Sequence, residues 1–219
     1  MWPPLGHCDE AAVPGVNPAF WHAQLPCRRQ IGVAGMRKFH DRRAFDARRA
    51  LSPHFKLHEF TRSATAEKHQ LNNMPREEFE LANLRALATH ILEPARTIIG
   101  APIVITSGYR CATLNRLIGG ARRSQHMLGE AADFIVQGFD MEAVALLLSG
   151  AKALPYDQLI YEARERENAA PMCWVHISHK RFGTNRREAL SIRRSGDAQK
   201  VLPGIQGPAQ FGMKATSAA

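Results

Sequence analysis

His126 and Asp133 lie seven positions apart in the segment that runs from residue 124 to residue 133. Both residue types are common metal ligands. In a continuous helix, seven residues would separate them by about 10 Å along the axis, too far apart to share one ion. Gly129 lies between them, and glycine tolerates turns that other residues resist. We therefore expect His126 in a loop and Asp133 at the start of a strand, where both could bind one metal if a third ligand joins them.

His176 is the candidate for that third ligand. It interrupts an apolar run over residues 173–177, where an imidazole without a partner would be costly. From the residues alone, other interpretations stay open. His126 and Asp133 can form a structural hydrogen-bonded pair, and a single histidine beside a strand is commonly hydrogen-bonded or at the surface.

The elements that must position these side chains are a mixture of helices and strands. The run Asn72-Asn73-Met74-Pro75 is typical of a helix start, and helical apolar spacing continues from Leu84 to Gly100, with a kink or break expected at Pro94. Further helices are expected at 113–118 and 141–148, and strands at 102–106, 132–136, 158–161 and 173–177, of which the last two can pair as a hairpin. Because regular strand–helix–strand alternation is missing, the sequence predicts an α+β fold.

Length and hydropathy exclude several classes of protein. The 219 residues are 45% hydrophobic, which is enough for one domain with a substantial core. No run of 18 apolar residues occurs, and the first residues show no basic segment followed by a hydrophobic one. We therefore expect neither a membrane span nor an ordinary cleaved secretion signal.

The net charge of +9 is concentrated in the two flanks of the chain. Residues 1–50 hold 8 basic and 4 acidic side chains, residues 178–219 hold 8 and 2, and the part between them holds 13 and 14. This distribution favours solvated flanks over a nucleic-acid groove. We expect a basic N-terminal extension over 1–50, one domain over 51–190 and a basic, low-complexity tail over 191–219. We also expect a monomer that binds no specific nucleic acid.

The order of these motifs resembles a known enzyme family. Ser-x-His-x-x-Gly-x-Ala-x-Asp over residues 124–133, followed by Trp-x-His-x-Ser over 174–178, is similar to the zinc D-Ala-D-Ala carboxypeptidases of peptidase family M15, in their small phage-type and bacterial branch. The similarity continues in the same order through segments at 52–60, 73–75, 92–96, 105–110, 114–115, 119–120 and 157–162. The resemblance implies a small antiparallel sheet packed with helices, as in Hedgehog and DD-peptidase domains.

The resemblance also implies roles for individual residues. It implies one zinc ion per chain, held by His126, Asp133 and His176, with the fourth position open for water, which is the arrangement of a catalytic rather than a structural zinc site. Glu162 is implied as the general base, and Arg110 and Ser124 as substrate-binding residues.

The choice of base stays open at the level of the sequence. The segment from Ala163 to Pro171 is longer than the connection usual in this branch, so Glu165 and Glu167 remain alternatives to Glu162.

The predicted function is hydrolysis of peptidoglycan stem peptides, either as a D-Ala-D-Ala carboxypeptidase or as an endolysin-type endopeptidase. Without a secretion signal, such an enzyme would reach the cell wall by lysis or by another route. The alternative is a non-catalytic module that keeps the peptidase fold and binds the cell wall or a partner.

Overall fold

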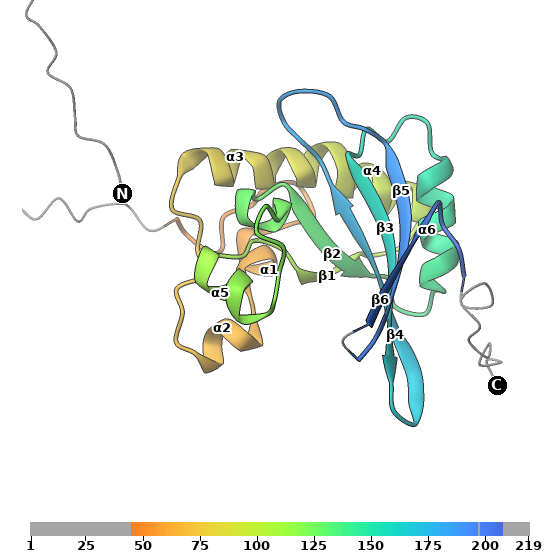
Figure 1. Cartoon of the computed structure of the whole chain (residues 1–219). Coiled ribbons are helices and arrows are strands. Elements are labelled where there is room, and N and C mark those ends of the chain that lie inside the picture. The colour runs from red at the N-terminus through yellow and green to blue at the C-terminus, as the bar shows by residue number, and fades with distance from the viewer. Residues whose placement is uncertain (1–44, 197, 208–219) are drawn as a thin grey trace, which may run out of the picture. The chain divides into compact units, whose positions relative to one another are not determined.

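The computed structural model describes residues 45–196 and 198–207. Its elements follow one another along the chain as short helices, a long helical segment and a set of strands with further helices between them (Figure 1). They are α1 (Leu57–Thr61), α2 (Ala64–Lys68), α3 (Glu78–Leu87), the π-helix η2 (Ala88–Leu92), α4 (Glu93–Ile99), β1 (Val104–Ser107), α5 (Ala112–Leu117), the 3₁₀-helix η3 (Gln125–Leu128), β2 (Ala131–Ile135), α6 (Met141–Gly150), β3 (Gln158–Arg166), β4 (Ala169–Ser178), β5 (Glu188–Ser195) and β6 (Ala198–Pro203).

The strands form one six-stranded sheet in the order β1-β2-β4-β3-β5-β6. Neighbouring strands are antiparallel, except that β5 runs parallel to β3. This mostly antiparallel sheet with helices confirms the predicted α+β fold. None of the helices in the described residues is long and apolar enough to cross a membrane.

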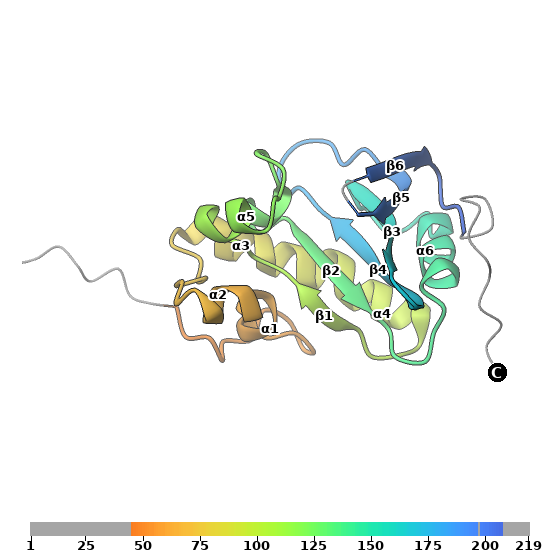
Figure 2. The same ribbon diagram turned by 60° about the horizontal axis from the view of Figure 1, so that its bottom comes forward.

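Helices cover one face of this sheet. α6 packs against β3 and β4, and the segment α3–η2–α4 shares one buried core with β1 and β2 (Figure 2). Leu159, Tyr161 and Ala163 of β3 point into this core, together with Val175 and Ile177 of β4. Since side chains alternate along a strand, the residues between them lie on the opposite face, which carries the candidate site.

The long helical segment starts later than the sequence predicts. Its first helix begins at Glu78, and the backbone N–H groups of Arg76 and Glu77 donate to the carboxylate of Glu80. Asn73 has another role, because its side-chain amide donates to the carbonyls of Thr61 and Tyr109. The asparagine-proline signal was therefore wrong as a helix start, because Asn73 connects the end of α1 to the loop after β1.

The irregularity expected at Pro94 is present. Proline has no N–H to offer the preceding turn, and the five residues of η2 immediately before α4 adopt π-helical hydrogen bonding. The helix then continues to Ile99 and ends at Gly100, whose φ of +74° is the left-handed conformation that glycine favours.

The β3–β4 hairpin is longer than predicted. Residues 163–166 and 169–171, which the sequence analysis treated as a connection, are paired strand residues. Only Glu167 and Asn168 form the turn, and Asn168 has a φ of +55°. The charged side chains of this segment therefore belong to a hairpin, whose register shifts by one residue between Arg164 and Arg166. Along β3 their facing follows strand alternation.

The sheet also continues past residue 190, where the sequence analysis placed the start of the tail. β5 and β6 occupy residues 188–203, and β5 pairs with β3 over seven residue pairs. The arginines of β5, which the sequence predicts to lie in a solvated tail, form ion pairs with residues of β3. Arg193 pairs with Glu165, and Arg194 pairs with Glu162. Residues 1–44 of the expected N-terminal extension lie outside the described part of the chain.

Candidate metal centre and cleft

The turn expected between His126 and Asp133 is formed by η3 and Gly129. Gly129 ends η3 with a φ of +71°, and β2 begins two residues later. A Cβ atom at this position would lie 2.5 Å from the backbone oxygen of Glu80, so the close approach of α3 also requires glycine. The predicted turn is present, but His126 lies in the 3₁₀-helix η3 and not in a loop, and Asp133 is the third residue of β2 and not its first.

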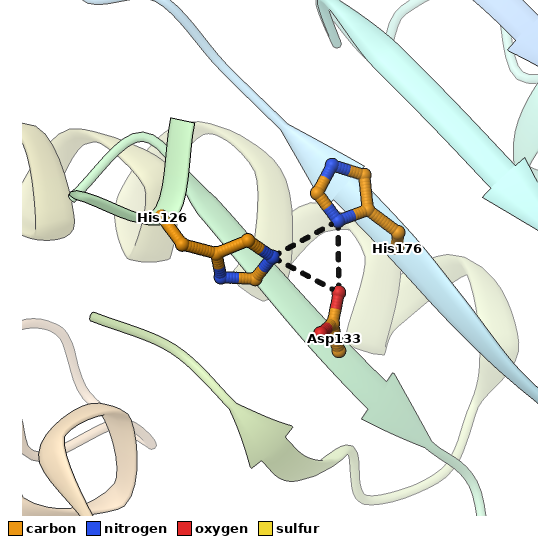
Figure 3. A group of neighbouring side chains, drawn as sticks. All are labelled: His126, Asp133 and His176. Carbon is orange, nitrogen blue, oxygen red and sulfur yellow. Dashed lines mark hydrogen bonds and ion pairs between the residues drawn. The ribbon is translucent and has the colours of Figure 1, made fainter. Parts of the chain in front are cut away.

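Sheet register brings in the third side chain. Asp133 of β2 lies directly opposite His176 of β4, and η3 places His126 beside them (Figure 3). Asp133 Oδ1 lies 2.8 Å from His176 Nδ1 and 3.2 Å from His126 Nε2, and the two imidazole nitrogens are 3.2 Å apart. All three residues are at least nine-tenths buried.

The chemistry of these three atoms fits a metal ion. His126 Nδ1 lies 2.7 Å from the carbonyl oxygen of Gly108, to which it can only donate, so its Nε2 presents a lone pair toward Asp133. Two acceptors thus face each other in a buried place, an arrangement that a cation would stabilise. Ligands about 2.1 Å from a tetrahedral zinc would be about 3.4 Å apart, close to the observed separations. The cluster of His126, Asp133 and His176 could therefore hold a metal ion.

The electrostatics favour the protonation states that a metal requires. Burial lowers the pKa of His126 and keeps this ring neutral. Burial opposes ionisation of Asp133, but the hydrogen bonds and charges around this carboxyl outweigh burial and hold its pKa well below the usual range. A neutral imidazole and a carboxylate are the states in which these groups bind metals.

Arg110 holds the far side of the Asp133 carboxylate. Its Nη2 donates to Asp133 Oδ2 at 2.7 Å and to Ser107 Oγ at 2.8 Å. A register irregularity at the end of β1 brings Ser107 opposite Asp133. Sequence reasoning selected Arg110 for substrate but missed its contact with Asp133 and missed Ser107, since neither contact has a signal in residue spacing.

The metal cluster lies in an open cleft of about 720 Å³, a size usual for ligand sites. One side of it is lined by Ser124 and by the preceding loop, namely Ile118, Gly119, Gly120, Ala121 and Arg123. The sheet lines the other side with residues from all six strands, namely Ser107, Asp133, Trp174, His176, Gln158, Ile160, Glu162, Arg164, Ile192, Arg194 and Gln199. Arg110 also lines this cleft, so both residues expected to bind substrate lie along it.

Among the three glutamates considered as bases, Glu162 is the one that lines the cleft. It lies opposite Trp174 on β4, two pairs along from His176 and on the same face of the sheet. Burial raises the pKa of Glu162, and the Asp133 charge raises it further. Glu165 points to the other face and pairs with Arg193, and Glu167 is exposed in the hairpin turn.

Comparison with known proteins identifies the family. The sequence profile described as Peptidase M15 matches residues 53–166, just over half of the chain, so the chain belongs to peptidase family M15. The match includes His126 and Asp133, and His176 joins them through the pairing of β4 with β2. The comparison with curated proteins gave no match.

Proposed function

We propose that the protein is a zinc-dependent peptidase that hydrolyses peptidoglycan stem peptides. The observation that carries the proposal is the convergence of His126 Nε2, Asp133 Oδ1 and His176 Nδ1 on the floor of an open cleft. Membership of family M15, a family of metallopeptidases, supports the same class of reaction. Two histidines and one carboxylate, with a further position left open, are a ligand set typical of catalytic zinc.

The proposed chemistry assigns the proton transfers to Glu162. A bound zinc would acidify a water molecule and polarise the carbonyl of the scissile peptide bond. Glu162 accepts the proton of that water and delivers it to the departing amine, as a general base and then a general acid. Its partly buried position suits this role, because the raised pKa makes its carboxylate a better proton acceptor than an exposed one.

The proposed role of Arg110 has two parts. Its contact with Asp133 Oδ2 fixes the orientation of the carboxylate so that Oδ1 faces the two histidines. Its place in the cleft wall also lets it contact a carbonyl or carboxylate of the substrate. Ser124, at the rim beside His126, is proposed as a second hydrogen-bonding contact to the peptide.

The alternative proposal is a non-catalytic module that binds cell wall or a partner. It explains the fold but gives no reason for a complete ligand set or for a partly buried glutamate in the same cleft. The structure-based observations therefore favour the enzyme.

Digestion of purified peptidoglycan tests the proposal. We expect the zinc-supplemented full chain to release products that mass spectrometry identifies as alanine from the end of the stem, for a carboxypeptidase, or as shorter peptides, for an endopeptidase. The His126→Ala variant serves as the matched inactive protein. If the wild type leaves the material unchanged but binds it as tightly as the His126→Ala variant does, the non-catalytic alternative is correct.

A further inference from the structure

The end of the cleft formed by β3, β5 and β6 carries two neighbouring arginines. Arg164 and Arg194 are register partners on the parallel strands β3 and β5, and both line the cleft. Like charges placed side by side on one sheet face repel each other and destabilise the pair. An anion bound between the two guanidinium groups would offset this repulsion.

Both arginines have hydrogen-bond donors available. Arg194 uses Nε to contact Glu162 Oε2 at 3.3 Å, which leaves the two terminal nitrogens of its guanidinium for another acceptor. Arg164 is exposed and has no ion-pair partner within the part of the chain that the structure describes. Arginine is the side chain best suited to grip a carboxylate with two parallel hydrogen bonds.

The charge of the whole cleft points the same way. Its lining contains four arginines and two carboxylates. Asp133 is paired with Arg110, and Glu162 is paired with Arg194. The remaining positive charge, from Arg164 and from Arg123 on the opposite loop, attracts an anionic rather than a neutral peptide.

We propose that Arg164 and Arg194 form a carboxylate-binding subsite that makes the enzyme prefer peptides with a free carboxylate near the scissile bond. This inference rests on the proposed peptidase function. β4, which carries His176, and β5, which carries Arg194, are separated by β3 alone. The arginine pair also lies four residues along the strands from Ile160, the register partner of His176. The backbones at His176 and Arg194 are therefore about 16 Å apart, which is about five residues of extended peptide at most, and the long arginine side chains shorten this gap. The carboxylate belongs either to the peptide's C-terminus or to an acidic side chain, and both have the same chemistry.

Half of the subsite, Arg194, lies beyond the segment that identifies the family. The family match ends at residue 166, whereas β5 and β6 begin at residue 188. One of the two arginines therefore comes from a part of the chain to which the family match assigns no role.

Paired synthetic peptides test the inference. Each pair contains the bond found to be cleaved in the peptidoglycan digest. One pair compares a free with an amidated C-terminus, and the other compares glutamate with glutamine at an internal position. For the full-length wild type we expect kcat/KM at least about 10-fold higher for one carboxylate peptide than for its neutral partner, mainly through KM, as charge-assisted hydrogen bonds predict.

Arg164→Gln is the main variant, since Arg164 makes no ion pair whose loss would disturb the described site. We expect it to reduce the preference about 10-fold or more while kcat on the neutral peptide stays close to wild type. Arg194→Gln should also reduce the preference. Because this variant also removes a contact of Glu162, only the ratio between paired peptides is compared. Arg166→Gln, with the same charge change two residues along β3 and outside the cleft lining, should keep the preference.

The outcomes separate this inference from the proposed function. If the wild type releases no product from peptidoglycan, the peptidase proposal is wrong. If the wild type cleaves both members of each pair equally, or if Arg164→Gln keeps the wild-type preference, the peptidase stands and the carboxylate subsite is wrong.

Discussion

Asp133 and His176 face each other across β2 and β4, with Asp133 Oδ1 2.8 Å from His176 Nδ1. Two of the three candidate ligands are therefore held at their spacing by the hydrogen-bond register of the sheet. A slip of one residue would turn either side chain to the helix-covered face. The metal centre therefore depends on correct pairing of β2 with β4, which positions Asp133 and His176. His126 is positioned by η3 and the turn at Gly129.

Replacing any one of the three ligands should remove the metal. His126→Ala, Asp133→Ala and His176→Ala are each expected to lose the zinc that the wild type holds at about one ion per chain, because two remaining ligands bind a metal much more weakly. Elemental analysis after zinc supplementation and desalting measures this. His90→Ala is the control, since His90 is an exposed histidine outside the cluster. A wild type that remains free of metal after this treatment would contradict the assignment.

Replacing Glu162 should separate catalysis from metal binding. Glu162→Gln keeps the shape of the side chain but cannot accept the proton, so we expect a loss of roughly 10²–10⁴-fold in turnover with zinc content unchanged. Peptide cleavage and elemental analysis are measured on the same preparation. Glu165→Gln and Glu167→Gln are matched controls on the same hairpin, outside the cleft, and should retain activity. Near-wild-type turnover of Glu162→Gln would remove Glu162 as the base and leave the metal site untouched.

Much of the site could be predicted from the sequence because its signals are local. The residues from Ser124 to Asp133 contain two ligands and the glycine that turns the chain between them, and His176 is conspicuous in an apolar strand. The family resemblance then placed Glu162 in the cleft, where the structure also has it. Strand alternation settles its facing relative to Glu165, once the hairpin is seen to extend to Arg166.

The parts that could not be predicted depend on contacts between distant segments. Asn73 is of a residue type common at helix N-caps, but its side-chain amide donates to backbone carbonyls 12 and 36 residues away in the sequence. The basic residues of β5 resemble a solvated tail because their partners, Glu162 and Glu165, lie about 30 residues earlier in the sequence. Composition and periodicity describe one segment at a time, so they cannot reveal pairings of this kind.

Gly129→Ala should damage both the fold and the metal centre. A φ of +71° costs a non-glycine residue about 1–2 kcal/mol, and the new Cβ would also meet the backbone oxygen of Glu80 at 2.5 Å. Gly138→Ala is the matched control, since Gly138 has a φ of +78° but open space around its Cβ position. We expect Gly138→Ala to lose only the stability that the positive φ costs an alanine. Gly129→Ala should lose more stability, and it should also lose zinc affinity. Urea unfolding and zinc titration compare them, and equal effects would contradict the close-contact argument.

Truncation after residue 190 should be far more harmful than truncation after residue 207. The shorter chain lacks most of β5 and all of β6, so the edge of β3 would lose its partner strand and expose unpaired backbone groups. The longer chain keeps Gln206, whose backbone N–H donates to Ser191 Oγ at 2.7 Å. Thermal unfolding and size-exclusion chromatography compare the two, with the full chain as reference. If a chain ending at residue 190 remains monomeric and as stable as the full chain, the domain ends at residue 190, as the sequence predicts.

Asp157 should make the protein sensitive to acid. Its side chain is fully buried and accepts hydrogen bonds from Arg186 Nε at 3.0 Å and Nη2 at 2.8 Å, and it lies 3.1 Å from Lys180 Nζ. Burial alone would raise the pKa of Asp157, but these cations outweigh it and hold the pKa well below the usual range. A lowered pKa means that the folded state binds the proton less tightly than the unfolded state does.

The stabilisation from Asp157 is therefore complete above the unfolded pKa, about 3.9, and decreases as the pH falls below it. Asp157→Asn should lower the free energy of unfolding at pH 7 by about 1–3 kcal/mol, as expected for the loss of charge-assisted hydrogen bonds. The difference from wild type should shrink progressively below about pH 4. Urea unfolding across this pH range measures it, with Glu78→Gln as the exposed control, expected to stay within about 0.5 kcal/mol of wild type. A difference that stays constant between pH 7 and pH 3 would show that Asp157 stabilises the fold by packing and not by charge.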